Sequence, residues 1–289
     1  MDIVLENDFL TVGVKRKGAE LASVFHKKTN LEYMWNADPA FWGKSSPVLF
    51  PIVGTLRGDQ YRYDGKTYSL PRHGFARDHA FEVERQERDH AIFLLRSSEA
   101  TREKYPFHFE LRLHYRLREN HLLVTYDVRN MGDSMMYFSI GGHPAFKVPL
   151  VDGARYEDYF LEFEKKETTG RWPLDAGLVK AQSTPLLDDS NVLPLTRSLF
   201  ADDAVVLKHL RSTKVSLKSH TNHHGLEFSF DGFPFLGIWA APNANFVCIE
   251  PWCGIADAVN HNQDFTTKEG IEKIGAGGSW MKMWSVEFF

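Results

Sequence analysis

The sequence predicts an all-β protein built as a large antiparallel two-sheet sandwich. Apolar and polar residues alternate along many short segments, which is the period of a half-buried strand. No segment of 12 residues or more shows a strong helical period. Aromatic residues make up 13% of the chain, and their rings favour the pleated surface of a sheet. Because the strands follow one another without a linker rich in proline, glycine or serine, we expect a single domain over residues 1–289.

The first 70 residues predict short strands and tight turns. Alternating apolar residues indicate strands at 9–14 and 21–25, and a proline after an aspartate indicates a turn or single helical turn at 38–42. Residues 46–54 contain two prolines, so we expect an irregular or edge segment there. Asp64-Gly65 supplies the positive φ angles of a two-residue turn, which predicts a hairpin over 61–68.

The clearest period runs from residue 107 to 117, where apolar and mainly charged side chains alternate strictly. It predicts a long half-buried strand with a charged outer face. Glu119-Asn120 turns the chain into a returning strand at 124–128. We expect the apolar run that ends at His143 to be the third strand of this meander.

The second half of the chain predicts further short strands. Residues 150–200 are rich in glycine, proline, aspartate and serine, so we expect one strand at 159–163 and otherwise irregular excursions over one face of the sheet. A short helix is expected near 266–273. Strands are expected at 81–84, 92–95, 204–207, 215–217, 226–230, 236–240, 246–250 and 280–288.

Composition excludes several classes of function. A net charge of −4, without a long block of one sign, argues against nucleic acid as a partner. No run of 18 apolar residues occurs and the N-terminus lacks the features of a signal peptide, so we expect no membrane association and a cytoplasmic location. Cys248 and Cys253 have no second cysteine pair to complete a zinc ribbon, and we expect both to be free thiols.

Three stretches place ionisable residues where a strand or loop would hold them. His143 follows two glycines and precedes a proline at the end of an apolar run, so its ring should be held at the rim of a sheet. His73 lies between Arg72 and Gly74, and Arg77 follows shortly after. Glu250 emerges from an apolar strand, where a carboxylate pays a desolvation cost.

Each of these residues also has a purely structural interpretation. His143 could be a structural histidine, His73 a loop histidine and Glu250 half of a structural ion pair. Asp203 follows Asp202 directly before a predicted strand, and an acidic pair at this position does not by itself indicate a function. Together, however, a carboxylate, two histidines and several arginines without metal-ligand spacing suit proton transfer, and we expect no metal and no cofactor.

Four motifs in sequence carry a resemblance to a known family. They are Arg-His-Gly-Phe-Ala-Arg at 72–77, Gly-Gly-His-Pro-Ala-Phe at 141–146, Asp-Ala-Val-Val at 203–206 and Cys-Ile-Glu-Pro-Trp at 248–252. Their order and spacing resemble the aldose 1-epimerase (galactose mutarotase-like) superfamily, most closely its LacX-like branch. The resemblance covers almost the whole chain and implies a β-supersandwich that interconverts the α and β anomers of a free sugar.

The resemblance also implies roles for individual residues. Glu250 matches the general base of the family and His143, as imidazolium, the general acid that protonates the ring oxygen. His73 matches the histidine that helps to polarise that oxygen, and Asp203 an aspartate that hydrogen-bonds sugar hydroxyls. The substrate-binding arginine is either Arg57 or Arg77, because the segment before the first hairpin departs from the family pattern.

Three other functions remain open on the sequence. The first is a hexose-6-phosphate mutarotase, in which Arg72 and Arg77 would clamp the phosphate. The second is a non-catalytic sugar-binding or sugar-sensing protein, which would not need both an acid and a base. The third is a glycosidase that uses Glu250 with Asp203, which would require a defined carboxyl separation. In each case the expected partner is a sugar or sugar phosphate, bound by a monomer or homodimer.

Overall fold

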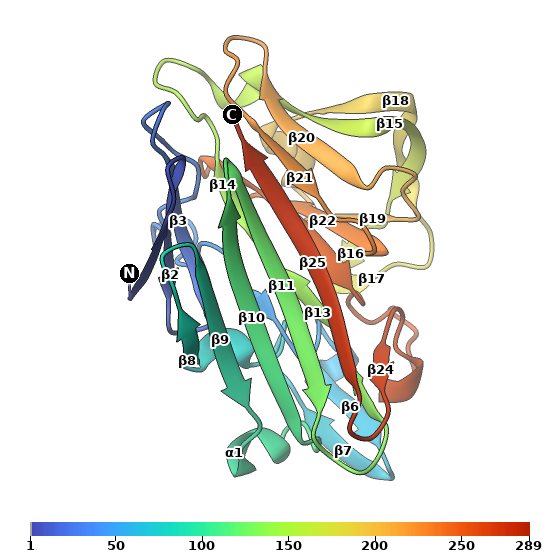
Figure 1. Ribbon diagram of the computed structural model, residues 1–289. Helices are drawn as coiled ribbons and strands as arrows, with labels where there is room; N and C mark the ends of the chain where they lie inside the picture. The colour runs from blue at the N-terminus through green and yellow to red at the C-terminus, as the bar shows by residue number, and fades with distance from the viewer. Residues whose placement is uncertain (1) are drawn as a thin grey trace.

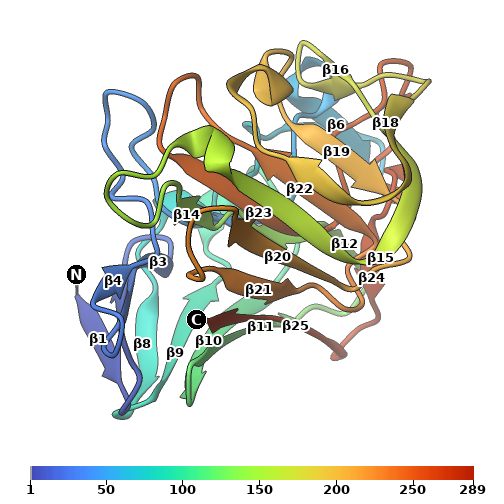
Figure 2. The ribbon, with the colours of Figure 1, turned by 90° about the horizontal axis from the view of Figure 1, so that it is seen from above.

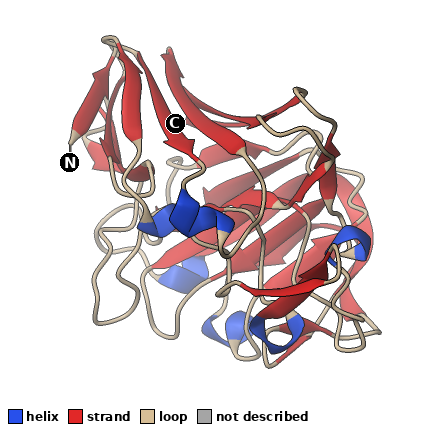
Figure 3. Cartoon of the chain, turned by 90° about the horizontal axis from the view of Figure 1, so that it is seen from below, coloured by secondary structure: helices blue, strands red, loops and turns tan. Residues whose placement is uncertain are grey.

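Strands predominate throughout the part of the chain that the computed structural model describes, residues 2–289 (Figure 3). Within these residues the α-helical content is one short helix, α1 (Glu99–Arg102), accompanied by brief 3-10 turns. The predicted all-β class is therefore confirmed.

The largest sheet of the described chain has nine antiparallel strands, and β10, β11 and β25 run side by side along its centre (Figure 1). Its order is β18 (Thr184–Pro194), β15 (Tyr159–Arg171), β20 (Lys214–Ser219), β21 (Leu226–Ser229), β25 (Ser279–Phe288), β11 (His121–Asn130), β10 (Phe109–Arg118), β9 (His90–Arg96) and β8 (Glu82–Gln86).

Strand β10 shows why the alternating pattern folds this way. Leu111 and Leu113 face the core and are at most 1% exposed, whereas the residues between them turn to the outer face. Arg112 on that face is nevertheless buried, because Glu84 and Glu110 accept its guanidinium hydrogen bonds at 2.8–2.9 Å. The predicted strand and its charged outer face are confirmed.

A second sheet packs inside the curve of the first (Figure 2). Aromatic contacts join the two layers, with the rings of Phe146 and Phe228 centred 6.1 Å apart. Residues Ile249 and Cys253 belong to the main core between the layers, while Trp252 packs in a smaller apolar cluster. The second sheet comprises β19 (Val205–Lys208), β22 (Phe235–Trp239), β23 (Phe246–Cys253), β13 (Ile140–Gly142) and β5 (Val48–Leu49), with β14 (Ala145–Lys147) also paired to β23.

Smaller elements surround the two sheets. Asp64 and Gly65 adopt φ angles of 48° and 70° in the turn between β6 (Gln60–Tyr63) and β7 (Lys66–Ser69), as predicted. Strand β5 lies at a sheet edge, also as predicted. The remaining elements are β1 (Ile3–Glu6), β2 (Leu10–Lys15), β3 (Glu20–His26), β4 (Leu31–Glu32), β12 (Met136–Phe138) paired with β24 (Glu272–Ile274), and β16 (Leu174–Asp175) paired with β17 (Leu178–Val179).

Three expectations about the elements are wrong. The apolar run before His143 is not a third strand of the meander, because it divides into β12, which pairs with β24, and β13, which joins the second sheet. Residues 159–194 form the long, bulged β15–β18 pair rather than a single short strand. Only a 3-10 turn, Phe265–Thr267, replaces the helix expected near 266–273, and β24 follows it.

Two further features concern the cysteines and the helices of residues 2–289. Cys248 and Cys253 are both free, as expected, and the structure shows that both are buried. Among residues 2–289, helices with the length and apolar character needed to cross a bilayer are absent.

The contact between β22 and β23 yields a test of the packing. A Cβ atom at Gly237 would lie 2.3 Å from the buried ring of Trp252, which also lies close to Gly141. We expect Gly237→Ala to lower the free energy of unfolding by about 1–3 kcal/mol, the usual cost of overpacking. Urea denaturation of wild type and Gly237→Ala measures the difference in the free energy of unfolding. Gly275→Ala, whose Cβ would contact nothing within 4 Å, is the matched control and should change stability by less than about 0.5 kcal/mol. Equal effects of the two substitutions would contradict this packing.

Candidate active site

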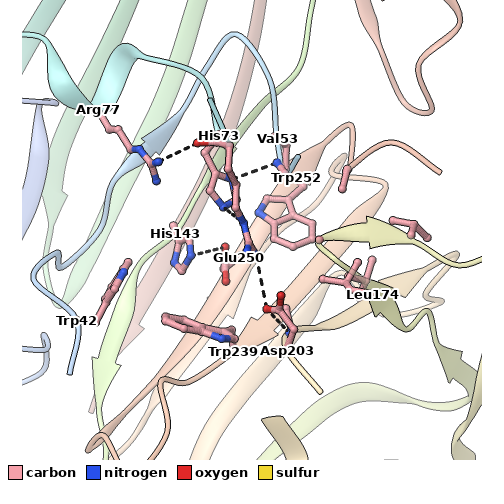
Figure 4. Close-up of a pocket in the computed structure, with 17 residues that line it drawn as sticks. Trp42, Val53, His73, Arg77, His143, Leu174, Asp203, Trp239, Glu250 and Trp252 are labelled. Atoms are coloured by element: carbon pink, nitrogen blue, oxygen red, sulfur yellow. Dashed lines mark hydrogen bonds and ion pairs between the residues drawn. The ribbon is translucent and has the colours of Figure 1, made fainter. Parts of the chain in front are cut away.

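A cavity of about 300 Å³ opens on the second sheet, and the three motif stretches meet there (Figure 4). Side chains of a strand alternate between its two faces, so residues 250 and 252 of β23 lie on the face opposite Ile249 and Cys253. Glu250, His143, His73, Asp203, Arg72 and Arg77 all line the cavity. The fold therefore brings together six of the seven residues singled out by the sequence.

Glu250 forms the floor of the cavity. Its side chain is 1% exposed and lies within β23, between Cys248 and Trp252 on the same face of the strand. Burial raises the pKa of its carboxyl well above the ordinary value of 4.5, although the nearby Arg72 guanidinium opposes this shift. The environment thus favours the protonated carboxyl.

His143 stands beside Glu250 because two glycines let the chain approach. A Cβ at Gly141 would lie 2.5 Å from the Trp252 ring, and one at Gly142 would lie 2.7 Å from the Tyr126 hydroxyl. With Pro144 after it, His143 occupies the break between β13 and β14, both of which pair with β23. Its Nε2 lies 3.3 Å from Glu250 Oε2.

Aromatic rings enclose the His143 side chain. Its ring centroid lies 4.8 Å from that of Trp42 and 5.6 Å from that of Trp239. This burial lowers the pKa of His143 to about 3, so the ring is neutral near neutral pH. The imidazolium expected from the sequence is therefore not the form that the surroundings favour, because they desolvate the charge.

His73 lies in a tight turn next to this pair. Its backbone has φ of 68° and its ring centroid lies 5.8 Å from that of His143. Gly74 follows with φ of 70°, where a Cβ would lie 2.3 Å from Phe50 O, so only glycine fits. Gly54 N–H donates to His73 Nδ1 at 3.1 Å.

The charged rim of the cavity is formed by one aspartate and two arginines. Arg72 Nη2 lies 3.5 Å from Asp203 Oδ1, and Arg77 Nη2 donates to the Arg72 carbonyl at 2.8 Å. Arg57, the other candidate for a substrate contact, lies outside the cavity lining, and its guanidinium donates to His261 O. Of the two alternatives left open by the sequence, the geometry places only Arg77 at the cavity.

Several buried polar atoms around the cavity lack a hydrogen-bond partner within residues 2–289. They are His143 Nδ1, both carboxyl oxygens of Glu250, Trp252 Nε1 and Arg77 Nε. An unsatisfied buried donor or acceptor costs about 1–3 kcal/mol. Donors and acceptors gathered at one cavity fit a ligand rich in hydroxyl groups.

Sequence reasoning missed part of the cavity wall. Trp42 and Trp239 flank His143, and Leu174, Gly177 and Val179 of the β16–β17 hairpin form the opposite side. Trp42 lies in a turn and Trp239 in a run of apolar residues. Apart from the aromatic side chain itself, nothing in the sequence around either residue indicated a place in the cavity wall. The hairpin lies in the segment expected to be irregular, where only the Ala176-Gly177 pair marks a turn.

The part of the chain that the structure describes contains one group of side chains with ligand atoms close enough to share a metal ion. His143, Cys248 and Glu250 have such atoms within 4.8 Å of one another. Two of the three, His143 and Glu250, already lie 3.3 Å apart, and the Cys248 thiol is held protonated by burial, which raises its pKa well above 9.0. The arrangement is thus explained without a metal by the pairing of Glu250 with His143.

Comparison with known proteins shows which family this chain resembles over most of its length. The family model described as aldose 1-epimerase matches residues 1–270. Two proteins of Lactococcus lactis subsp. lactis, protein LacX of plasmid and of chromosomal origin, are each 36% identical over 285 residues, which is 95% of this chain and 95% of theirs.

Solved structures extend the likeness to three dimensions. A galactose mutarotase related enzyme from Lactobacillus acidophilus superposes with a TM-score of 0.96 at 39% identity, covering 100% of this chain and 97% of that one. A galactose mutarotase-like protein from Lactobacillus casei ATCC 334 gives 0.92 at 33% identity, covering 99% of each chain.

The burial of His143 predicts a pH dependence of stability. Its folded pKa, about 3, lies below the unfolded value of 6.5, so unfolded chains take up a proton first and stability is lost as pH falls from 6.5 towards 3. We expect wild type to lose about 2 kcal/mol more than His143→Gln between pH 7 and pH 5. Urea denaturation of both proteins at the two pH values measures the difference. Equal losses would show that His143 is charged in the folded protein at pH 5.

Proposed function

The chain belongs to the aldose 1-epimerase family, and on that premise we propose that it interconverts the α and β anomers of a free hexose such as galactose or glucose. The observation that carries the proposal is the contact between Glu250 and His143, 3.3 Å apart at the floor of the cavity. A carboxyl and an imidazole at this distance form a pair that can donate one proton and accept another.

The reaction needs one proton taken and one given. Glu250, as carboxylate, removes the proton of the anomeric hydroxyl, while His143, as imidazolium, gives its proton to the ring oxygen. The bond between C1 and the ring oxygen breaks and an aldehyde forms. Rotation about C1–C2 presents the other carbonyl face, and the same groups return both protons as the ring closes.

The protonation states of the pair fit this cycle. The neutral form favoured by burial, carboxylic acid beside imidazole, is the form reached after the first proton transfer, when the sugar is open. The charged form begins the cycle, and the Arg72 guanidinium beside the cavity stabilises its carboxylate. Because the resting pair is neutral, the charged pair must form before the ring opens, and the contacts that the sugar makes at the cavity must offset that cost.

The walls of the cavity suit a monosaccharide. A volume of about 300 Å³ lies at the lower end of the range for small-molecule sites. Trp42 and Trp239 offer apolar ring surfaces to the C–H faces of a sugar, and Asp203 and Arg72 offer an acceptor and donors to its hydroxyls. His73 supplies a further polar group at the same wall.

A second candidate, a hexose-6-phosphate mutarotase, is favoured by the arginines. Arg72 is about half exposed at the cavity, and the buried Nε of Arg77 has no hydrogen-bond partner within residues 2–289. A phosphate could accept from both guanidinium groups. The opposing observation is that Arg72 already pairs with Asp203, which would sit beside the phosphate and repel it.

Substitution of the proton-transfer pair tests the proposed reaction. We expect Glu250→Gln and His143→Asn each to lower the rate of anomer exchange by at least about 10²-fold while the fold remains, because each removes a proton carrier. Exchange between anomers of glucose and galactose, followed by proton NMR, measures the rate.

The matched control is Glu227→Gln, which removes a carboxylate that pairs with Lys214 outside the cavity. It should exchange anomers at the wild-type rate. Wild-type turnover by Glu250→Gln or His143→Asn would contradict the roles given to these residues.

A substitution at the rim distinguishes free from phosphorylated substrates. If the substrate is a free hexose, Arg72→Met should lower kcat/KM by less than about tenfold, because the arginine contributes hydrogen bonds to hydroxyls. If the substrate is a 6-phosphate, the loss should exceed about 10²-fold and be confined to the phosphorylated sugar. The control is Arg57→Met, whose side chain lies outside the cavity lining. An equal loss with Arg57→Met would contradict the assignment of Arg72 to the site.

A further inference from the structure

A reciprocal pair of hydrogen bonds joins Gly54 to His73. His73 N–H donates to Gly54 O at 2.9 Å, and Gly54 N–H donates to the ring nitrogen His73 Nδ1 at 3.1 Å. A neutral imidazole accepts only through the nitrogen that carries no proton. The bond from Gly54 therefore places the ring proton of His73 on Nε2.

Arg72 competes for the same ring. Its Nε lies 3.3 Å from His73 Nε2 in donor geometry, and one neutral ring cannot accept from both donors. The Gly54 N–H decides between them, because it is a fixed and buried backbone group, whereas the Arg72 side chain is 46% exposed and also pairs with Asp203. Nε2–H is then a donor at the wall of the cavity, available to an oxygen of the ligand once Arg72 turns away.

The position of Gly54 depends on Ala256. Gly54 has φ of 73°, and a Cβ added to it would lie 2.6 Å from the Ala256 methyl group. Ala256 also lines the cavity. Gly54 is thus held between Ala256 on one side and His73 on the other.

A buried lysine fixes the segment that carries Ala256. Lys268 Nζ donates to Ile255 O at 2.5 Å and to Asp257 Oδ1 at 2.9 Å, on either side of Ala256. Asp257 Oδ2 accepts the Arg57 N–H at 2.9 Å, and Asp257 N–H donates to Thr55 O at 2.9 Å. Lys268 and Asp257 are each 2% exposed.

We propose that Lys268 and Asp257 are positioning residues that act through Ala256 and Gly54 to fix the tautomer of His73 with its proton on Nε2. The use of that proton as a hydrogen-bond donor to the oxygen of an opening sugar ring rests on the proposed function. The tautomer itself does not, because it follows from the contacts among residues 54, 73, 255–257 and 268.

The path from Lys268 to His73 contains only rigid links. Two ionic or polar contacts hold the 255–257 segment, two backbone hydrogen bonds hold His73 to Gly54, and a close van der Waals contact joins the two parts. Movement of the segment by a few tenths of an ångström would pass directly to Gly54, since packed atoms transmit displacement. If the hydrogen bond from Gly54 N–H to His73 Nδ1 became longer, Arg72 Nε would donate to His73 Nε2 instead, and the ring proton would move to Nδ1.

Nitrogen NMR of protein labelled with ¹⁵N-histidine tests the proposal. His73→Asn identifies the His73 signals among those of the 13 histidines. In wild type we expect His73 Nδ1 to resonate as an unprotonated nitrogen and Nε2 as a protonated one. In Lys268→Met we expect both signals to move towards the mixed-tautomer position, and kcat for anomer exchange to fall about tenfold with KM changed less than about twofold.

Two further variants make the result decisive. Ala256→Gly removes the contact with Gly54 without leaving Asp257 unpaired, so it serves if Lys268→Met does not fold, and it should shift the His73 signals in the same direction. Arg112→Met breaks another buried ion pair, on the outer face of the nine-stranded sheet, and should leave the His73 signals and kcat unchanged even though it lowers the melting temperature.

Three outcomes would overturn or separate the claims. A protonated Nδ1 on His73 in wild type would overturn the proposal, as would unchanged His73 signals and kcat in folded Lys268→Met or Ala256→Gly. If wild type accelerates no anomer exchange, the proposed function fails, and the His73 signals still decide whether Lys268 and Asp257 control the tautomer.

Discussion

The site depends on one physical constraint. A carboxyl and an imidazole are buried together, and the loss of solvent raises the free energy of their charged forms. Glu250 and His143 lie 3.3 Å apart, and burial shifts both pKa values towards the neutral forms. Two such groups with one proton between them can exchange roles within a single catalytic cycle. The aromatic walls, the glycines of β13 and the rim arginines all serve to build or modulate this pair.

The fold achieves this by bringing backbones unusually close at the second sheet. Gly141, Gly142, Gly237 and Gly54 each leave no room for a Cβ, and each lies against a residue that lines the cavity or supports it. The nine-stranded sheet provides the apolar layer behind them, through Tyr126 and Trp284. The unfavourable free energy of backbone strain and desolvation at the cavity is thus offset by packing in the extensive core, as expected where function requires a strained local arrangement.

Sequence patterns predicted what depends on local periodicity and missed what depends on pairing partners. The alternation in β10 and the Asp-Gly turn of β6–β7 specified those elements, because side-chain burial and positive φ angles are local requirements. The division of the run before His143 between β12 and β13 was not predictable, since it depends on β24 and β23 far along the chain. The motifs led to residues that line one cavity, but the neutral form of His143 is favoured by burial against Trp42 and Trp239, which only the fold brings to it.

In the proposed reaction, the bond between C1 and the ring oxygen breaks while the anomeric oxygen stays on C1. Glucose labelled with ¹⁸O at the anomeric oxygen tests it, because ¹³C NMR resolves C1 bearing either isotope in both anomers. We expect wild type to equilibrate the anomers while the label remains on C1. Loss of the label to water at the rate of anomer exchange would show that the bond from C1 to the anomeric oxygen breaks instead, and would contradict the roles assigned to Glu250 and His143.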